Sequence, residues 1–165
     1  MSDKIKKLLS DQKARDERKR RFDEVLRQKA AVVSARDERS ARPEPGDPMP
    51  DGTICAGISP ETNQPMYTTT ADAPLTMIFN EAKEYAAKLD AHGHQDWHVP
   101  TKAELNVLFN NRAAIGGFDV SGSDPAGWYW SSSQGSKWNA WCRRFSDGSR
   151  NDYPKLIHLS VRPVR

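Results

Sequence analysis

The chain has 165 residues, of which 36% are hydrophobic, and a formal net charge of +3. Its mean hydropathy of −0.81 is too low for one uniformly packed globule, and no stretch approaches the length of an apolar membrane span. The two cysteines, Cys55 and Cys142, are 87 residues apart without a CxxC pair, which excludes a disulfide scaffold and a cysteine-based zinc site.

Residues 1–40 predict a charged helical arm. Residues 1–44 carry 14 Lys and Arg against 9 Asp and Glu, and residues 3–40 contain no Gly or Pro, which favours a helix. The arm can self-associate, dock to a partner or stay solvated, although sustained heptads are absent. Interleaved acidic residues disfavour nucleic acid as a partner of its "RKRR" stretch. Most apolar residues of the arm fall roughly on one helical stripe: Ile5, Leu8, Leu9, Phe22, Val25 and Leu26.

The stretch "ARPEPGDPMPDG" contains four prolines and two glycines, which continue neither a helix nor a sheet. It predicts a linker over residues 41–51 and a folded domain that begins at Gly52. The N-terminal sequence "MSDKIKKLLSDQ" has no continuous apolar core of a secretory signal. We therefore expect a soluble protein that is cytoplasmic as synthesised, which is compatible with association with a virion.

Residues 52–165 show an α+β order. "TICAGI" and "PMYTT" predict two strands, and "LTMIFNEAKEYAAKLDAHG" predicts a helix that ends at Gly93. A second helix opens at Thr101, which stands with Glu104 at the spacing of a capping box. Three later segments, "WYWSSS", "AWCRRFS" and "LSVRPVR", predict strands. The expected fold is an α+β domain with two helices and a short antiparallel sheet, preceded by the helical arm.

Four motifs of the later half occur in a specific order: "DWHVPTKAELNVLF", "GWYWSSS", "AWCRRFSDG" and the terminal "VRPVR". Together they resemble the formylglycine-generating-enzyme branch of the C-type-lectin-like fold over residues 52–165. Within that branch, the chain is most similar to the variable proteins of diversity-generating retroelements. The resemblance implies that an error-prone reverse transcriptase rewrites the end of the gene, so that AAC codons become NNC codons. It also implies a ligand-binding protein that is not an enzyme and has no cofactor.

The irregular stretch "SRNDYPKLIH", residues 149–158, fits that mechanism, because NNC codons encode most of its residue types and Lys155 is the exception. Arg143 and Arg150 are accessible from a Gln codon. The resemblance implies a diversified surface for a protein or cell-surface ligand, with Tyr153, Arg150 and Leu156 as its first candidate anchors. The ligand-binding residues expected from it are Gly135, Ser136, Cys142, Arg143, Ser149, Arg150, Asn151, Asp152, Tyr153, Pro154, Leu156, Ile157 and His158.

A recognition surface whose residues vary requires a supporting set of residues, called the frame below, that does not vary. Variable side chains should point outward, and large apolar neighbours, most at alternating positions, should hold the backbone behind them. A rigid platform also limits the ordering cost of binding. The frame residues expected from this argument are Trp128, Trp130, Trp141, Phe145, Val161 and Val164.

Three alternatives stay open at this point. The stretch "AHGHQDWHVP" places three histidines, His92, His94 and His98, and Asp96 within seven residues, although a solvated turn is favoured over a metal site. Formylglycine-generating enzymes use paired cysteines and copper, whereas Cys142 stands alone, which disfavours a divergent oxidase. A metal- or sugar-binding lectin domain would need clustered carboxylates, and Asp119, Asp124 and Asp147 are the candidates for a structural calcium.

Overall fold

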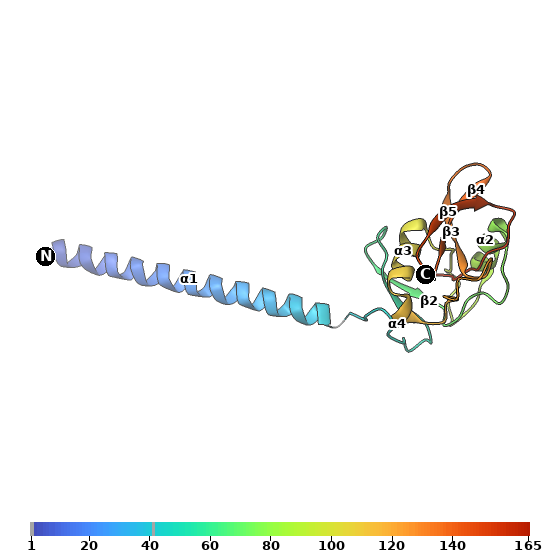
Figure 1. Cartoon of the computed structure of the whole chain (residues 1–165). Helices are drawn as coiled ribbons and strands as arrows, with labels where there is room; N and C mark the ends of the chain where they lie inside the picture. Colours follow the sequence, from blue (N-terminus) through green and yellow to red (C-terminus); the bar gives the residue numbers. More distant parts are fainter. Residues whose placement is uncertain (1, 41) are drawn as a thin grey trace. The chain divides into compact units, whose positions relative to one another are not determined.

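The structure is a computed structural model of the whole chain (Figure 1). It describes the backbone of residues 2–40 and 42–165, and the side chains of residues 6–9, 12–32 and 42–165. The chain divides into two compact units, Met1–Arg42 and Pro43–Arg165. Each unit is described by itself below.

The first unit consists of one helix, α1 (Ser2–Ser40), which confirms the helical arm. All of its described side chains are exposed, including the apolar residues of the expected stripe from Leu8 onward. Val32 extends this stripe and is exposed as well. The side chain of Ile5 lies outside the described residues.

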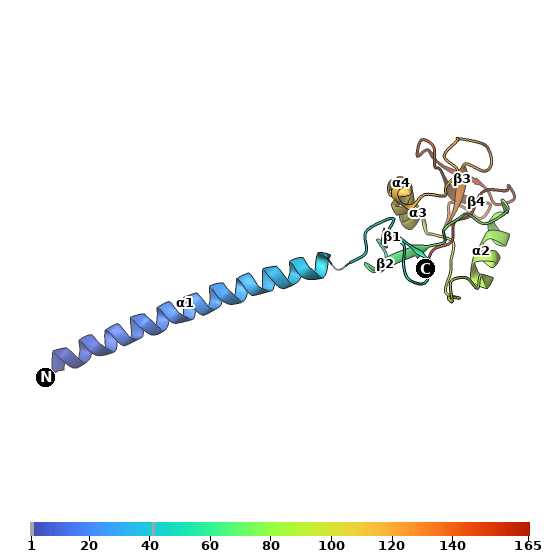
Figure 2. The same cartoon turned by 90° about the horizontal axis from the view of Figure 1, so that it is seen from below.

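The second unit contains two small antiparallel sheets and three helices, which confirms the α+β class (Figure 1). One sheet pairs the first two strands, and the other has the order β3-β4-β5. Helices α2 and α3 flank the three-stranded sheet on opposite sides (Figures 1 and 2). The elements are β1 (Ile54–Ile58), β2 (Pro65–Thr68), α2 (Phe79–Lys88), α3 (Lys102–Asn110), α4 (Arg112–Ile115), β3 (Trp128–Gln134), β4 (Asn139–Arg144) and β5 (Arg150–Pro154).

Side chains alternate across the three-stranded sheet and so build a core on each of its faces. On the α2 side, Trp128 and Trp130 of β3 pack with Phe79 and with the small residues Ala140 and Cys142 of β4. On the α3 side, Tyr129 packs with Phe145, Leu105 and Leu108. Both cores consist of fully or almost fully buried side chains, so the sheet is the central layer of this unit.

The C-terminal segment does not form the expected strand over residues 159–165. Its backbone instead bonds to several separate segments: Leu159 with Met77, Ser160 with β3, Val161 with Ala73, Val164 with His98, and Arg165 with Tyr67. No continuous ladder is possible with partners that change every few residues. The segment therefore crosses the core and connects parts of the domain that lie far apart in sequence.

A buried arginine fixes that crossing. The side chain of Arg162 is fully buried, and its Nε donates to Asp72 Oδ1 at 2.6 Å. The two remaining guanidinium nitrogens donate to the carbonyl oxygens of Thr69 at 2.7 Å and Gly117 at 2.5 Å. A buried guanidinium is stable only with such partners, so Arg162 is a structural residue.

The predicted start of α3 is confirmed, whereas the predicted ends of α2 are not. The capping box of α3 is confirmed, since Thr101 Oγ1 accepts from Glu104 N at 3.2 Å and Glu104 Oε2 accepts from Thr101 N at 3.0 Å. By contrast, α2 begins only at Phe79 because Met77 is already bonded to the C-terminal segment. It ends at Lys88, so Gly93 is not its stop and instead lies in the turn between Ala91 and His94.

The proline-rich segment is packed onto the folded unit. Gly46 N donates to Cys55 O at 2.8 Å, and Cys55 N donates to Asp47 O at 2.9 Å. The Cys55 thiol also contacts Pro43 O at 3.5 Å. These bonds to β1 extend the folded unit back to Pro43, nine residues before the predicted start at Gly52.

Candidate ligand-binding surface

Half of the irregular stretch at residues 149–158 is a strand. β5 pairs with β4 so that Arg150 lies opposite Arg143, Asp152 opposite Trp141, and Tyr153 opposite Ala140. Directly paired residues share a face of an antiparallel sheet. The pairs therefore divide the candidate residues between two faces, one toward α3 and the other toward the α2 core.

Most of the expected binding residues are on the open surface. Leu156 is 80% exposed, the largest exposed fraction among the large hydrophobic residues of the second unit. Asp152, Tyr153 and Ile157 are half-buried. The exposed candidates are Gly135, Ser136, Ser149, Arg150, Asn151, Pro154, Leu156 and His158.

Cys142 contradicts the expectation that it points outward. It is 2% exposed, lies in the core beside Trp130, and donates a hydrogen bond from Sγ to Asn151 O at 3.3 Å. Burial raises the pKa of its thiol to about 12. The physical reason is the period of the strand: Cys142 and Ala140 occupy the inward positions of β4, so a ligand does not reach the thiol.

Arg143 and Tyr153 are candidate residues that also pack against the fold. The Tyr153 ring lies 5.1 Å from the Trp128 ring, centroid to centroid, above the small inward residues of β4. Arg143 is 8% exposed, and its guanidinium lies 3.8 Å from the Phe109 ring centroid. Ile157 packs against the same core as Tyr153. These three side chains support the surface more than they project from it.

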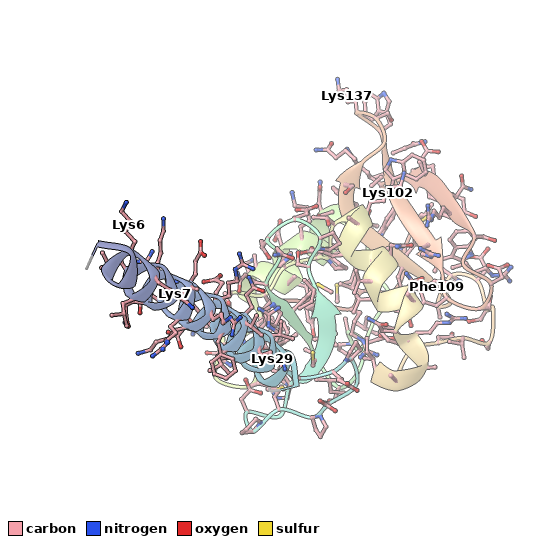
Figure 3. All side chains as sticks on the ribbon, turned by 90° about the vertical axis from the view of Figure 1, so that its left-hand side faces the viewer. Lys6, Lys7, Lys29, Lys102, Phe109 and Lys137 are labelled. Carbon is pink, nitrogen blue, oxygen red and sulfur yellow. The ribbon has the colours of Figure 1, made fainter. Side chains whose placement is uncertain are left out.

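The structure places five of the six expected frame residues in the core: Trp128, Trp130, Phe145, Val161 and Val164. Trp141 is the exception, because it lies on the α3 face of β4 near the edge of the core and is half-buried. Lys102 Nζ, at the start of α3, lies 3.3 Å from the centroid of its ring, a cation–π contact. Figure 3 labels Lys102 and Phe109 near the two ends of this helix, beside the sheet.

Lys155, the one residue of the stretch that an NNC codon does not encode, connects two segments of the surface through hydrogen bonds. Its Nζ donates to Gln134 Oε1 at 2.6 Å and to the carbonyl oxygens of Ser136 at 3.1 Å and Lys137 at 3.0 Å. The backbone N–H of Lys155 also donates to Trp138 O at 2.9 Å. The loop between β3 and β4 is thereby fixed to the end of β5, which brings Gly135 and Ser136 next to the rest of the surface.

Trp138 belongs to the same surface and was not predicted. It is 71% exposed, next to Lys137, which Figure 3 shows at the tip of the β3–β4 loop. The only sequence signal was a tryptophan within a short polar turn, "QGSKWN", where no core position is available. An exposed aromatic side chain of this size is typical of a binding surface.

The side chains considered for a metal site at residues 91–100 interact with other residues of the chain. His94 Nε2 lies 2.9 Å from Asp51 Oδ2, and His98 Nε2 lies 3.2 Å from Glu104 Oε2, so these histidines point to different partners. Asp96 binds Arg165 at 3.0 Å. Within residues 42–165 and the described part of the arm, no three His, Cys, Asp or Glu side chains form a metal-binding group.

Among the described residues, the other two alternatives have no assembled site either. Cys55 and Cys142 are free thiols with separate partners, so the structure does not form the cysteine pair that an oxidase of the formylglycine-generating type uses. Asp119 accepts hydrogen bonds from the hydroxyls of Ser121 and Ser123, both at 2.6 Å. Asp147 instead pairs with Arg144 at 3.4 Å.

Comparison with known proteins now adds the family. No curated protein matches the chain. In the described parts of the structure, no helix has the length and apolar character needed to cross a membrane. The model of one protein family, described as the Lcl C-terminal domain, matches residues 53–165, which include every strand and every helix of the second unit. The chain therefore belongs to the Lcl C-terminal domain family, a family of C-type-lectin-like binding domains.

Proposed function

We propose that this protein binds a protein or cell-surface ligand through a diversified recognition surface. The surface consists of the loop at residues 135–138, the positions of β4 and β5 on the α3 face of the sheet, and the segment at residues 154–158. The observation that carries the proposal is the contrast between these exposed, chemically varied side chains and the fully buried core beneath them. A rigid backbone that presents exposed side chains limits the entropy lost on binding.

The contrast between Lys155 and its neighbours supports diversification. Lys155 holds two backbone segments together through its ammonium group, which is a role that must persist when other residues change. Its neighbours Pro154 and Leu156 are exposed, and neither is among the described side chains that pack against the two cores. The expected genomic signature is a near-copy of the gene's 3′ end beside a reverse transcriptase gene, with differences confined to adenines. A copy that differs at random bases would contradict this mechanism.

A designed library tests the surface directly. We would introduce NNC codons at six exposed positions, namely Ser149, Arg150, Asn151, Pro154, Leu156 and His158, and display the full chain for selection against a panel of purified proteins. The matched control randomises six exposed positions of α2 and its flanks. We expect most members of the first library to fold, because exposed substitutions usually change stability by less than about 0.5 kcal/mol.

Binders should arise from the first library and not from the control. Equal recovery of binders from both libraries would contradict a dedicated surface. Unfolding of most members of the first library would contradict a frame that tolerates change.

We further propose that α1 assembles copies of the chain or docks it to a partner. The support is its row of exposed apolar side chains, in a helix whose described residues bury none of them. Several linked copies would raise the effective affinity of individually weak surfaces.

A further inference from the structure

A narrow groove runs between α3 and the face of the three-stranded sheet that packs against α3, next to the proposed surface. The groove consists of two adjoining pockets, a small inner end and a larger open end, which share two cationic side chains, Lys102 and Arg150. Its inner end has room for about one water molecule, about 10 Å³. The side chains that matter below are Lys102 and Asn106 from α3, and Trp141, Arg143 and Arg150 from the sheet.

The cationic side chains of this groove form no salt bridge within the described part of the protein. Arg143 Nη1 and Arg150 Nη2 both donate to one neutral atom, Asn106 Oδ1, the second at 2.8 Å. In the part of the chain with described side chains, neither guanidinium nor Lys102 forms a salt bridge with a carboxylate. Two guanidinium groups on one amide oxygen leave several N–H donors without an anion.

Arg143 is the unusual member of this group. It is 8% exposed, and its Nε has no hydrogen-bond acceptor among the described residues. Burial, followed by the nearby charges of Arg150 and Arg112, lowers the pKa of its guanidinium to about 10. Guanidinium groups stay charged in proteins, so a buried one with an unused donor favours a bound anion.

The borders of the groove limit the size of that anion. Glu61 lines the open end together with Lys102 and Arg150. Asp152 lies on the same face of the sheet as Trp141, its direct partner across the strands. A long polyanion would place more negative charge near these two carboxylates than a single small anion and would be repelled more strongly.

We propose that this groove binds one carboxylate group of a protein ligand, from an Asp or Glu side chain or from a C-terminus. The planar fork of Arg150 and the ammonium group of Lys102 bind the carboxylate oxygens. The exposed part of the Trp141 ring contacts the adjoining carbon atoms. The inference rests on the proposed function in taking the ligand to be a protein, but the anion site itself does not depend on diversification.

The site combines two parts of the chain. Arg143 and Arg150 belong to the candidate variable residues, whereas Lys102 and Asn106 belong to α3, outside residues 135–158. Variation at positions 143 and 150 would therefore change an anion site whose helical half is constant.

The experiment is a titration of the full chain with acetate that is monitored by NMR. Chloride keeps the ionic strength constant during the titration. The signals to follow are the Nε–H groups of Arg143 and Arg150 and the indole N–H of Trp141. We expect these signals to shift with a dissociation constant on the order of millimolar, as befits an ion of four heavy atoms. Arg150→Gln and Lys102→Gln should each weaken acetate binding by about tenfold.

Lys83→Gln is the matched control, because it removes one positive charge from α2 on the other side of the sheet and should leave the titration unchanged. The absence of shifts at all three wild-type signals would overturn the proposal, as would equal weakening by Lys83→Gln. An equal or stronger response to sulfate would overturn the assignment to a carboxylate. The test is separable from the library experiment: acetate can fail to bind while the library yields binders, and the reverse can also occur.

Discussion

Tyr153 and Leu156 lie three residues apart, but their surroundings differ. Leu156 is 80% exposed, whereas the Tyr153 ring packs against Trp128. We therefore expect Leu156→Ala to change the free energy of unfolding by less than about 0.5 kcal/mol. Tyr153→Ala should lower it by about 2 kcal/mol, since half-buried aromatic contacts are lost. Urea denaturation of both variants measures the difference, and equal destabilisation would show that Leu156 is part of the core.

Lys155 is expected to act on a loop that is distant in sequence. Its ammonium group makes three hydrogen bonds to residues 134–137, so Lys155→Ala should loosen the loop between β3 and β4. The expected cost is about 1 kcal/mol, typical of a few partly solvated hydrogen bonds. Hydrogen exchange should become faster at the amides of Trp138 and Asn139. Lys137→Ala is the control at an exposed neighbour, and the same acceleration in that variant would contradict a specific role of Lys155.

At the scale of elements, the β4–β5 turn depends on a glycine. Gly148 has φ of +81°, and a Cβ atom there would lie 2.6 Å from Phe109 Cζ. Gly148→Ala should therefore lower the free energy of unfolding by about 2–3 kcal/mol, through backbone strain and displacement of the ring.

Gly93→Ala provides the control for Gly148→Ala. Gly93 has a similar φ of +76°, but a Cβ atom there would meet nothing within 4 Å. The substitution should cost about 1 kcal/mol from the backbone alone. Thermal unfolding measures both variants, and equal losses would show that the contact with Phe109 is unimportant.

The start of α3 should make stability depend on pH. The hydrogen bond with Glu104 raises the pKa of His98 against the effect of burial. Burial opposes ionisation of Glu104, but hydrogen bonds from His98, Thr101 N and Ser59 outweigh it and lower its pKa to about 2. The histidine's contribution is complete below about pH 6.5 and is lost as pH rises through its raised pKa. The glutamate's contribution is complete above about pH 4.5 and is lost as pH falls toward 2.

The pair should therefore contribute most between about pH 4.5 and 6.5. Because the His98 side chain is 47% exposed, solvent screening limits its contribution to about 1 kcal/mol or less. We expect the difference in unfolding free energy between the wild type and His98→Gln to be largest in that window and smaller above it. A difference that is constant from pH 5 to pH 9 would contradict the ion pair. The charge of Glu61 also raises the pKa of His98, and Glu61→Gln tests this contribution in the same measurement of unfolding free energy against pH.

Elements with a clear local sequence pattern were predictable, whereas elements without one and contacts between distant segments were not. The cap of α3 needs only Thr101 and Glu104, three residues apart, so the sequence pattern predicted it. β5 has no alternating pattern, and its pairing with β4 is what makes it a strand. The resemblance placed Cys142 on the surface, whereas the period of β4 places it beside Ala140 in the core. The groove joins Asn106 to Arg143 across 37 residues, a contact that no spacing predicts.

At the scale of the whole molecule, the apolar side chains of α1 predict self-association of the chain. Phe22, Val25 and Val32 are exposed, and with Lys29 they follow the 3-4-3 spacing of a short coiled-coil seam. The full chain should therefore sediment above its monomer mass of 18.6 kDa, and Phe22→Ala with Val25→Ala should return it to the monomer. Arg20→Ala with Arg27→Ala is the control, because these positions lie on the opposite side of the helix.

If the wild-type chain sediments as a monomer at every concentration tested, α1 does not self-associate and its apolar side chains serve a different protein. If it associates, each oligomer presents several recognition surfaces to one target. Linked copies bind a multivalent surface about a hundredfold or more tightly than one copy does. A selected ligand of the library should then dissociate about a hundredfold faster from the Phe22→Ala, Val25→Ala chain when the ligand is immobilised at high density. At low density the two chains should dissociate at the same rate, because the recognition surface itself is unchanged.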